Sequence, residues 1–160
     1  MAVITPLTAE APPPPGLPPV AVVGCHGGCG ATTVTRLLAP AAREVMRDQM
    51  HTVGAAPLLL VARSTAYGLS WATRGITCAH NNLDLGQLAA PPLLVLVADS
   101  PLREPPTVRA RLRLVRDRVQ AVVRVPYVAA WRDTDDPLAV PRPRALVTAM
   151  SALQDELRGA

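Results

Sequence analysis

The stretch that decides the fold runs Val20-Ala21-Val22-Val23-Gly24-Cys25-His26-Gly27-Gly28-Cys29-Gly30-Ala31-Thr32-Thr33. A short apolar run passes into a loop with four glycines, and apolar residues at helical spacing follow. Such a run is typical of a strand that is buried on both faces of a parallel sheet. A strand that leads through glycines into a helix N-terminus offers backbone N–H groups to an anion. The stretch therefore predicts a phosphate site.

The helix that follows the loop is expected to begin near Gly30-Ala31. Its apolar face would be formed by Val34, Leu37, Leu38, Ala41 and Val45. Pro40 falls inside this pattern, and proline removes a helical hydrogen bond and clashes with the preceding turn. We therefore expect a kink or a break at Pro40.

Two further apolar runs predict buried strands, at residues 58–62 (ending at Arg63) and 93–99, and residues 121–125 predict a fourth strand. Helical patterns separate them: one after Ser64-Thr65, one after Pro105-Pro106, and a last one with an apolar stripe through Leu146, Met150, Leu153 and Leu157. Asn81-Asn82 and Gly86 indicate turns, and residues 133–143 a polar, proline-rich loop. Alternating strands and helices predict an α/β fold, a three-layer sandwich around a mainly parallel sheet.

In such a fold, ligands bind at the carboxyl ends of the strands. The glycine-rich loop, Arg63 and Asp99 are therefore expected on one rim of the sheet.

The length of 160 residues allows one domain with a real core. We expect a disordered, proline-rich segment at residues 1–19 and a single domain at 20–160. The odd number of cysteines, three, argues against a disulfide framework, and we see neither a signal peptide nor an apolar run long enough to cross a bilayer. A cytoplasmic protein is expected. The net charge of +4 permits an acidic partner.

The P-loop pattern G-x-x-x-x-G-K-[ST] is met at Gly24, Gly30 and Thr32, but Ala31 occupies the lysine position. Residues 26–33 resemble the deviant Walker A motif, K-G-G-x-G-K-[ST]-[ST], of ParA/MinD-type ATPases, the SIMIBI class of P-loop NTPases. Residues 93–99 are similar to their Walker B strand, which ends in an aspartate. The resemblance is good over the first strand, loop and helix, and coarse beyond. It implies a P-loop NTPase-like fold of reduced size.

The resemblance also implies a set of site residues. The nucleotide, ATP or ADP with Mg²⁺, would be bound by Gly27, Gly28, Cys29, Gly30, Ala31, Thr32, Thr33, Arg63 and Asp99. Thr32 and Asp99 would hold the Mg²⁺. Both family lysines are replaced, by His26 and Ala31, and the chain contains no lysine, so its 16 basic residues are all arginine. Arg63 is the candidate replacement cation, or else a partner of Asp99 or a solvent-facing residue.

Two further groups of residues have the composition of a binding site, but each also has a purely structural interpretation. Cys25, Cys29, Cys78 and His80 have the chemistry of zinc ligands, but their spacing is unusual and small buried cysteines are commoner. Zinc is therefore not expected. A second group lies on one predicted helix and has the composition of a non-specific DNA-binding stripe, or of a solvated helix face: Arg109, Arg111, Arg113, Arg116 and Arg118.

The sequence therefore favours a degenerate ParA/MinD-like protein that binds a nucleotide or another phosphate ligand weakly, with little or no hydrolysis. It would act through a protein partner or as a homodimer. The alternative is an interaction module that has lost its ligand and serves a DNA-transfer (conjugation), plasmid partition or secretion assembly. A third hypothesis is a slow ATPase whose cation comes from Arg63 or a second subunit.

Overall fold

The structure is a computed structural model and describes residues 16–160. The disordered segment expected at residues 1–19 thus falls outside the described residues up to residue 15. The strands are β1 (Val20–Gly24), β2 (Ala42–Glu44), β3 (Leu58–Arg63), β4 (Leu93–Val97) and β5 (Val122–Val125). The helices are α1 (Ala31–Leu37), α2 (Ala66–Asp84), α3 (Pro106–Val115) and α4 (Arg144–Gly159), with short 3-10 segments η1 (Arg47–Thr52), η2 (Arg116–Arg118) and η3 (Ala129–Arg132).

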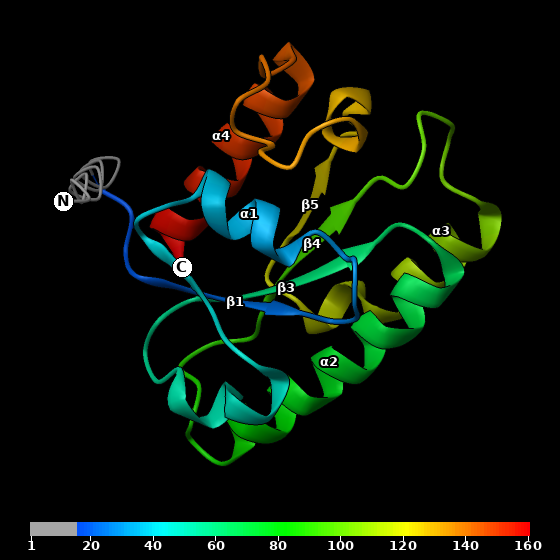
Figure 1. The fold of residues 1–160 in the computed structure, drawn as a ribbon. Coiled ribbons are helices and arrows are strands. Elements are labelled where there is room, and N and C mark those ends of the chain that lie inside the picture. Colours follow the sequence, from blue (N-terminus) through cyan, green and yellow to red (C-terminus); the bar gives the residue numbers. More distant parts are fainter. Residues whose placement is uncertain (1–15) are drawn as a thin grey trace, which may run out of the picture.

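The five strands form one sheet in the order β2-β1-β3-β4-β5, and every neighbouring pair is parallel. Helices cover both faces of this sheet (Figure 1). The predicted α/β fold, a three-layer sandwich around a parallel sheet, is therefore confirmed.

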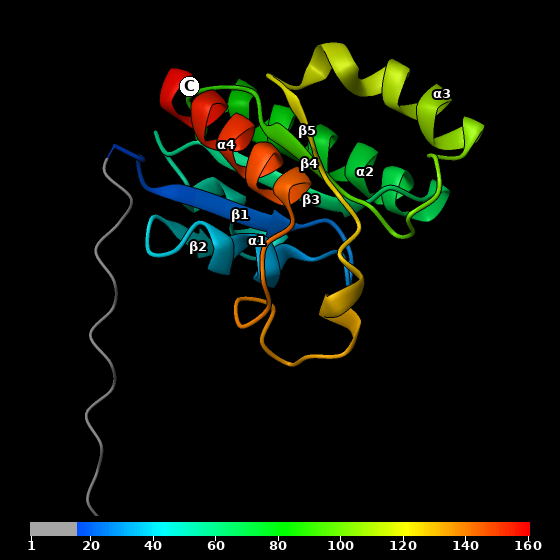
Figure 2. The same cartoon turned by 90° about the horizontal axis from the view of Figure 1, so that it is seen from above.

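The core has two halves, because the central strands are apolar on both faces. Leu60 and Leu94 face α2 and α3, whereas Leu59 and Val95 face α1 and α4. Figure 2 shows α4 lying across the sheet on the face opposite α2. The four-residue stripe predicted for the last helix is buried in the second half of the core.

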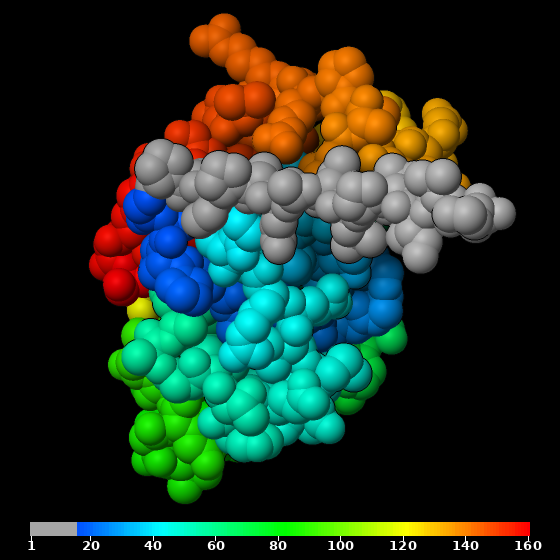
Figure 3. Space-filling view, turned by 60° about the vertical axis from the view of Figure 1, so that its left-hand side comes forward, coloured from blue at the N-terminus to red at the C-terminus, as the bar shows by residue number. Residues whose placement is uncertain are grey.

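The interruption expected at Pro40 is confirmed, but the apolar residues after it, Ala41 and Val45, do not lie on a helix. α1 ends at Leu37, and the chain then forms β2, which pairs with β1. Pro40 prevents α1 from continuing, because proline cannot donate a helical hydrogen bond. The residues after it form a strand at the edge of the sheet, where a nearby proline is tolerated. Val45 is buried, but it follows this strand rather than lying on α1. Figure 3 shows the segment around η1, coloured cyan to teal, at the surface of the molecule.

The other elements follow the predicted order with shifted ends. Thr65 caps α2, as expected for a Ser-Thr pair, by accepting a hydrogen bond from the Gly68 N–H at 2.9 Å. The turn predicted at Asn81-Asn82 is wrong, because α2 continues to Asp84. β4 ends at Val97, two residues before the predicted end. Among the described residues, no helix has both the length and the apolarity needed to span a membrane.

Candidate functional site

The strand order fixes where a ligand has room to bind. From β1 the chain forms β2 on one side and then crosses to β3 on the other. In parallel α/β sheets this reversal opens a crevice outside the carboxyl ends of the two diverging strands. Here the crevice lies between the loop after β1 and Arg63 at the end of β3. The glycine-rich loop thus stands where this topology places a binding site.

The loop presents a run of backbone donors. Within residues 16–160, no protein acceptor bonds the amide N–H groups of His26, Gly27, Gly28, Gly30, Ala31, Thr32 or Thr33. Two loop residues do have bonded N–H groups: Cys25 donates to the Val61 carbonyl at 2.9 Å, and Cys29 donates to the His26 carbonyl at 3.4 Å. The first intrahelical bond of α1 comes from Val34 to Gly30 at 2.9 Å. A series of free N–H groups on one short loop is the arrangement that binds anions.

Two glycines allow the loop to take this shape. Gly28 and Gly30 have φ angles of 71° and 95°, in the left-handed region that other residues rarely adopt. A Cβ on Gly30 would also stand 3.3 Å from a Val97 methyl group on β4. The loop conformation therefore depends on glycine at these two positions.

A pocket of about 900 Å³ opens over the loop. Its walls are the loop itself, the segment after β2, and Arg63. Its ionisable lining includes His26, Glu44, Arg47, Asp48 and Arg63. The volume is within the range of small-molecule sites.

Arg63 lies at the rim, as predicted, and links the glycine-rich loop to the end of β4. Its Nε donates to the Gly28 carbonyl at 3.0 Å, and a terminal nitrogen donates to the Ala98 carbonyl at 3.2 Å. The loop and Arg63 thus meet on one rim, as expected, whereas Asp99 shares with Arg63 a separate cavity that the loop does not line. Arg63 forms no ion pair with Asp99 within residues 16–160, where the ion pairs involve other residues.

The His26 ring links the loop to β3. Its Nε2 accepts a hydrogen bond from the backbone N–H of Arg63 at 3.2 Å. Its Nδ1 is 2.9 Å from the Gly27 carbonyl. Both ring nitrogens are therefore engaged within the protein.

Ala31 is buried, with 5% of its surface exposed, and packs with the apolar residues of α1. It also lines the pocket. The wall is therefore apolar at the position where a P-loop enzyme has its lysine.

Glu44 and Arg47 also line the pocket, but the sequence did not predict them, because their positions depend on β2. The Thr32 hydroxyl donates to the Glu44 carboxylate at 3.0 Å, from the end of β2. Arg47 donates to the Cys25 carbonyl and stacks on Trp71, with 4.9 Å from its guanidinium carbon to the ring centre. Recognising Ala42–Glu44 as a strand beside β1 would have placed both residues at this rim.

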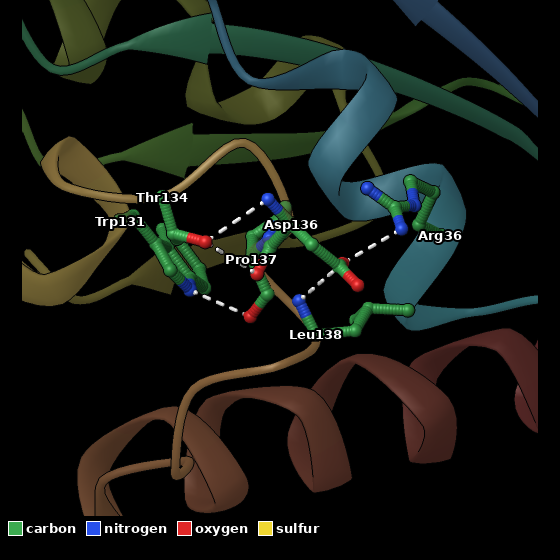
Figure 4. A network of polar contacts seen from close by, with 6 residues as sticks. All are labelled: Arg36, Trp131, Thr134, Asp136, Pro137 and Leu138. Carbon is green, nitrogen blue, oxygen red and sulfur yellow. Dashed lines mark hydrogen bonds and ion pairs between the residues drawn. The ribbon is translucent and has the colours of Figure 1, made fainter.

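Asp99 lies on the same rim but outside this pocket. It is exposed, and it lines a separate cavity of about 100 Å³ with Tyr127 and Trp131. Trp131 is engaged in packing: its Nε1 donates to the Pro137 carbonyl at 3.1 Å (Figure 4). In the same network Asp136 accepts bonds from Leu138 and from Arg36 on α1. Trp131 therefore holds the loop before α4, and neither Tyr127 nor Trp131 lines the larger pocket.

The cysteines do not assemble with His80. The His80 Nε2 donates to the Arg118 carbonyl at 2.7 Å, on the α3 side of the molecule. Within residues 16–160, no group of three or more His, Cys, Asp or Glu side chains is placed to hold a metal ion.

Alkaline pH is expected to destabilise the protein through Cys25. Burial, together with the nearby Cys29, raises the pKa of the Cys25 thiol from 9.0 to about 12, although Arg47 acts in the opposite direction. A pKa that is higher in the folded state contributes stability that is intact below pH 9 and is lost between pH 9 and 12. Urea unfolding of wild type and Cys25→Ala across this range tests the expectation. A pH dependence that is identical in the two proteins would contradict it.

The five arginines of the expected DNA stripe are divided between two directions. Arg111 donates to the Ala66 carbonyl, and Arg118 to the Thr77 hydroxyl at 3.3 Å, so both fasten this segment to α2. The other three face a different cavity, of about 630 Å³, beside β5: Arg109, Arg113 and Arg116. The structure therefore brings three of the five together.

Comparisons with family models, with curated proteins and with solved structures gave no match for this chain.

Proposed function

We propose that the chain binds the phosphate groups of a nucleotide in the loop after β1, hydrolyses it slowly or not at all, and acts through a partner. The single observation that carries the proposal is the set of seven N–H groups between His26 and Thr33, all but that of Cys29, that have no acceptor within residues 16–160. They line a pocket large enough for a nucleotide, at the crevice where the strand order reverses. The resemblance of residues 26–33 to the Walker A motif of ParA/MinD-type ATPases points to the same ligand.

The absence of efficient hydrolysis is inferred from the charges around the loop. In P-loop enzymes the lysine contacts the β- and γ-phosphates and offsets charge in the transition state. Ala31 supplies no charge, and Arg63 is engaged with two carbonyl oxygens. Losing one preorganised electrostatic contact typically lowers a rate by about 10²- to 10³-fold. The third hypothesis, a slow ATPase, would need Arg63 to leave these carbonyls or a second subunit to supply a cation.

If Mg²⁺ accompanies the nucleotide, Thr32 and Glu44 are the residues placed to hold it. P-loop proteins use the Ser/Thr of the loop together with a carboxylate. The carboxylate in contact with Thr32 is Glu44, on β2, whereas Asp99 lines the other cavity. The Mg²⁺ residues proposed from the structure thus differ from the pair Thr32 and Asp99 expected from the sequence.

Calorimetric titration with ATP, ADP and pyrophosphate, with and without Mg²⁺, tests the proposal. Wild type should bind at least one of these ligands. The variant Gly27→Glu should bind it roughly tenfold more weakly, because the new carboxylate repels phosphate in the pocket. Gly27 has no neighbouring atom within 4 Å of an added Cβ and no left-handed φ, so the substitution fits without strain.

The matched control is Gly159→Glu, at the end of α4, where the added Cβ also meets nothing within 4 Å. It carries the same charge change far from the loop and should bind like wild type. Equal weakening in both variants would show that overall charge, and not the loop, governs binding.

A second candidate function, an interaction module without a ligand, is favoured by a different observation. Two polar side chains that a ligand would use are already bonded within the protein: Arg63 to two carbonyls and Thr32 to Glu44. The absence of heat with every ligand in the titration would support this candidate and overturn the first.

A further inference from the structure

A groove lies at the edge of the sheet farthest from β2, away from the glycine-rich loop. The cavity of about 630 Å³ lies between α3 and α4. Its floor includes Gln120 and Ala121, which precede β5, and Val122 and Arg124 of β5 itself. β5 is the last strand of the sheet, so one of its edges has no strand partner within residues 16–160. The groove therefore follows an open sheet edge.

The edge offers main-chain hydrogen bonds at strand spacing. The carbonyls of Ala121 and Val125 accept bonds from Leu94 and Ala98 on the β4 side. Backbone groups alternate in direction along a strand, so those of Val122 and Arg124 point to the open edge. An edge of this kind is a template for another extended chain.

The groove is also strongly cationic. Arg109, Arg113, Arg116 and Arg124 line it, against the carboxylates of Asp117 and Glu156. Arg124 is paired with Glu104 at 2.9 Å. The other three arginines are exposed and form no ion pair within the described part of the chain. Unpaired guanidinium groups beside a groove select a partner that carries carboxylates.

The spacing of the arginines matches that of a strand. α3 connects the parallel strands β4 and β5, so it runs back along them. Arg109 and Arg113 are one helical turn apart, a rise of about 6 Å. Side chains on one face of a strand repeat about every 6.6 Å. Carboxylates at every second residue of an added strand would therefore meet successive arginines.

We propose that this groove binds an extended, acidic peptide segment of a partner protein, which adds to the sheet as a strand beside β5. Val122 and Arg124 would supply the main-chain bonds, and Arg109, Arg113 and Arg116 would contact alternate carboxylates. A nucleic acid also carries negative charge, but its backbone lacks the alternating N–H and C=O groups that the open edge complements. The peptide is therefore the favoured occupant.

The test uses fluorescence anisotropy with a labelled peptide of alternating glutamate and valine. Wild type should bind it, with an affinity that falls as salt rises. The double variant Arg113→Glu/Arg116→Glu should bind at least tenfold more weakly. The control Arg103→Glu/Arg142→Glu makes the same charge change at exposed residues outside the groove and should bind like wild type.

A second probe separates strand addition from simple charge attraction and leaves the protein unaltered. The same peptide, N-methylated at every residue, keeps its carboxylates but has no main-chain N–H group to donate to the edge. It should bind at least tenfold more weakly. Equal binding of the two peptides, no binding by wild type, or stronger binding of a single-stranded oligonucleotide in competition would each overturn the proposal.

Discussion

Replacing Arg63 by alanine should lower the affinity for a nucleotide roughly 30-fold in the same calorimetric titration. Its guanidinium links the loop, through Gly28, to the end of β4, through Ala98. The side chain is therefore both a cation of the pocket and the brace that keeps the loop open. Hydrogen bonds to charged groups contribute about 1.5–3 kcal/mol each, and a loss of about 2 kcal/mol corresponds to this factor.

Arg103→Ala is the matched control, because Arg103 is exposed and lies outside the pocket. Arg63→Lys adds a second comparison, since it keeps the charge but cannot bond two carbonyls in the same fork. The lysine variant should fall between wild type and alanine. Equal affinities for wild type and Arg63→Ala would remove Arg63 from the binding site.

Gly68→Ala should lower the free energy of unfolding by more than about 3 kcal/mol, a value typical of severe overpacking. A Cβ at this position would stand 2.1 Å from the carbonyl oxygen of Arg63 and 2.9 Å from its carbonyl carbon. Both atoms belong to the backbone, so no side chain can move to make room. The first turn of α2 would have to leave the end of β3 and lose its cap from Thr65.

Urea unfolding measures this effect, and Gly27→Ala provides the control. An added Cβ on Gly27 meets nothing within 4 Å, so this variant should stay within about 0.5 kcal/mol of wild type. A Gly68→Ala protein as stable as Gly27→Ala would show that α2 does not pack against β3 as the structure has it.

The sequence predicted the fold well where the apolar runs were long enough to identify strands. The runs at β1, β3 and β4 are buried on both faces, so each consists of consecutive apolar residues up to its last position. In β5 the exposed Arg124 interrupts the apolar run, and the remaining valines were still enough to indicate a strand. β2 has only three residues, Ala42-Arg43-Glu44, and its side chains are half-buried or exposed. Its only signal is Pro40, which shows where α1 ends but does not indicate that a strand comes next. Pairing with β1 decides that, and pairing is not visible in a local pattern.

Because β2 was not predicted, two residues of the site were not predicted either. The loop and Arg63 could be predicted, because the loop directly follows one long strand and Arg63 ends another. Glu44 and Arg47 reach the pocket only because β2 lies beside β1. The direction of each arginine on α3 and η2 could not be predicted either, because it depends on where α2 packs. Arg111 and Arg118 face α2, whereas Arg113 and Arg116 face the groove.

The two-sided core has a consequence for synthesis on the ribosome. Val20 and Val22 of β1 share one apolar face with Leu153 and Leu157 of α4. Until α4 has been made, this face of the sheet is covered by α1 but lacks the apolar residues of α4, so the strands that support the glycine-rich loop stay partly exposed. Contacts so distant in sequence form late and slowly. A chaperone that shields exposed apolar strands should therefore associate with the nascent chain until α4 emerges.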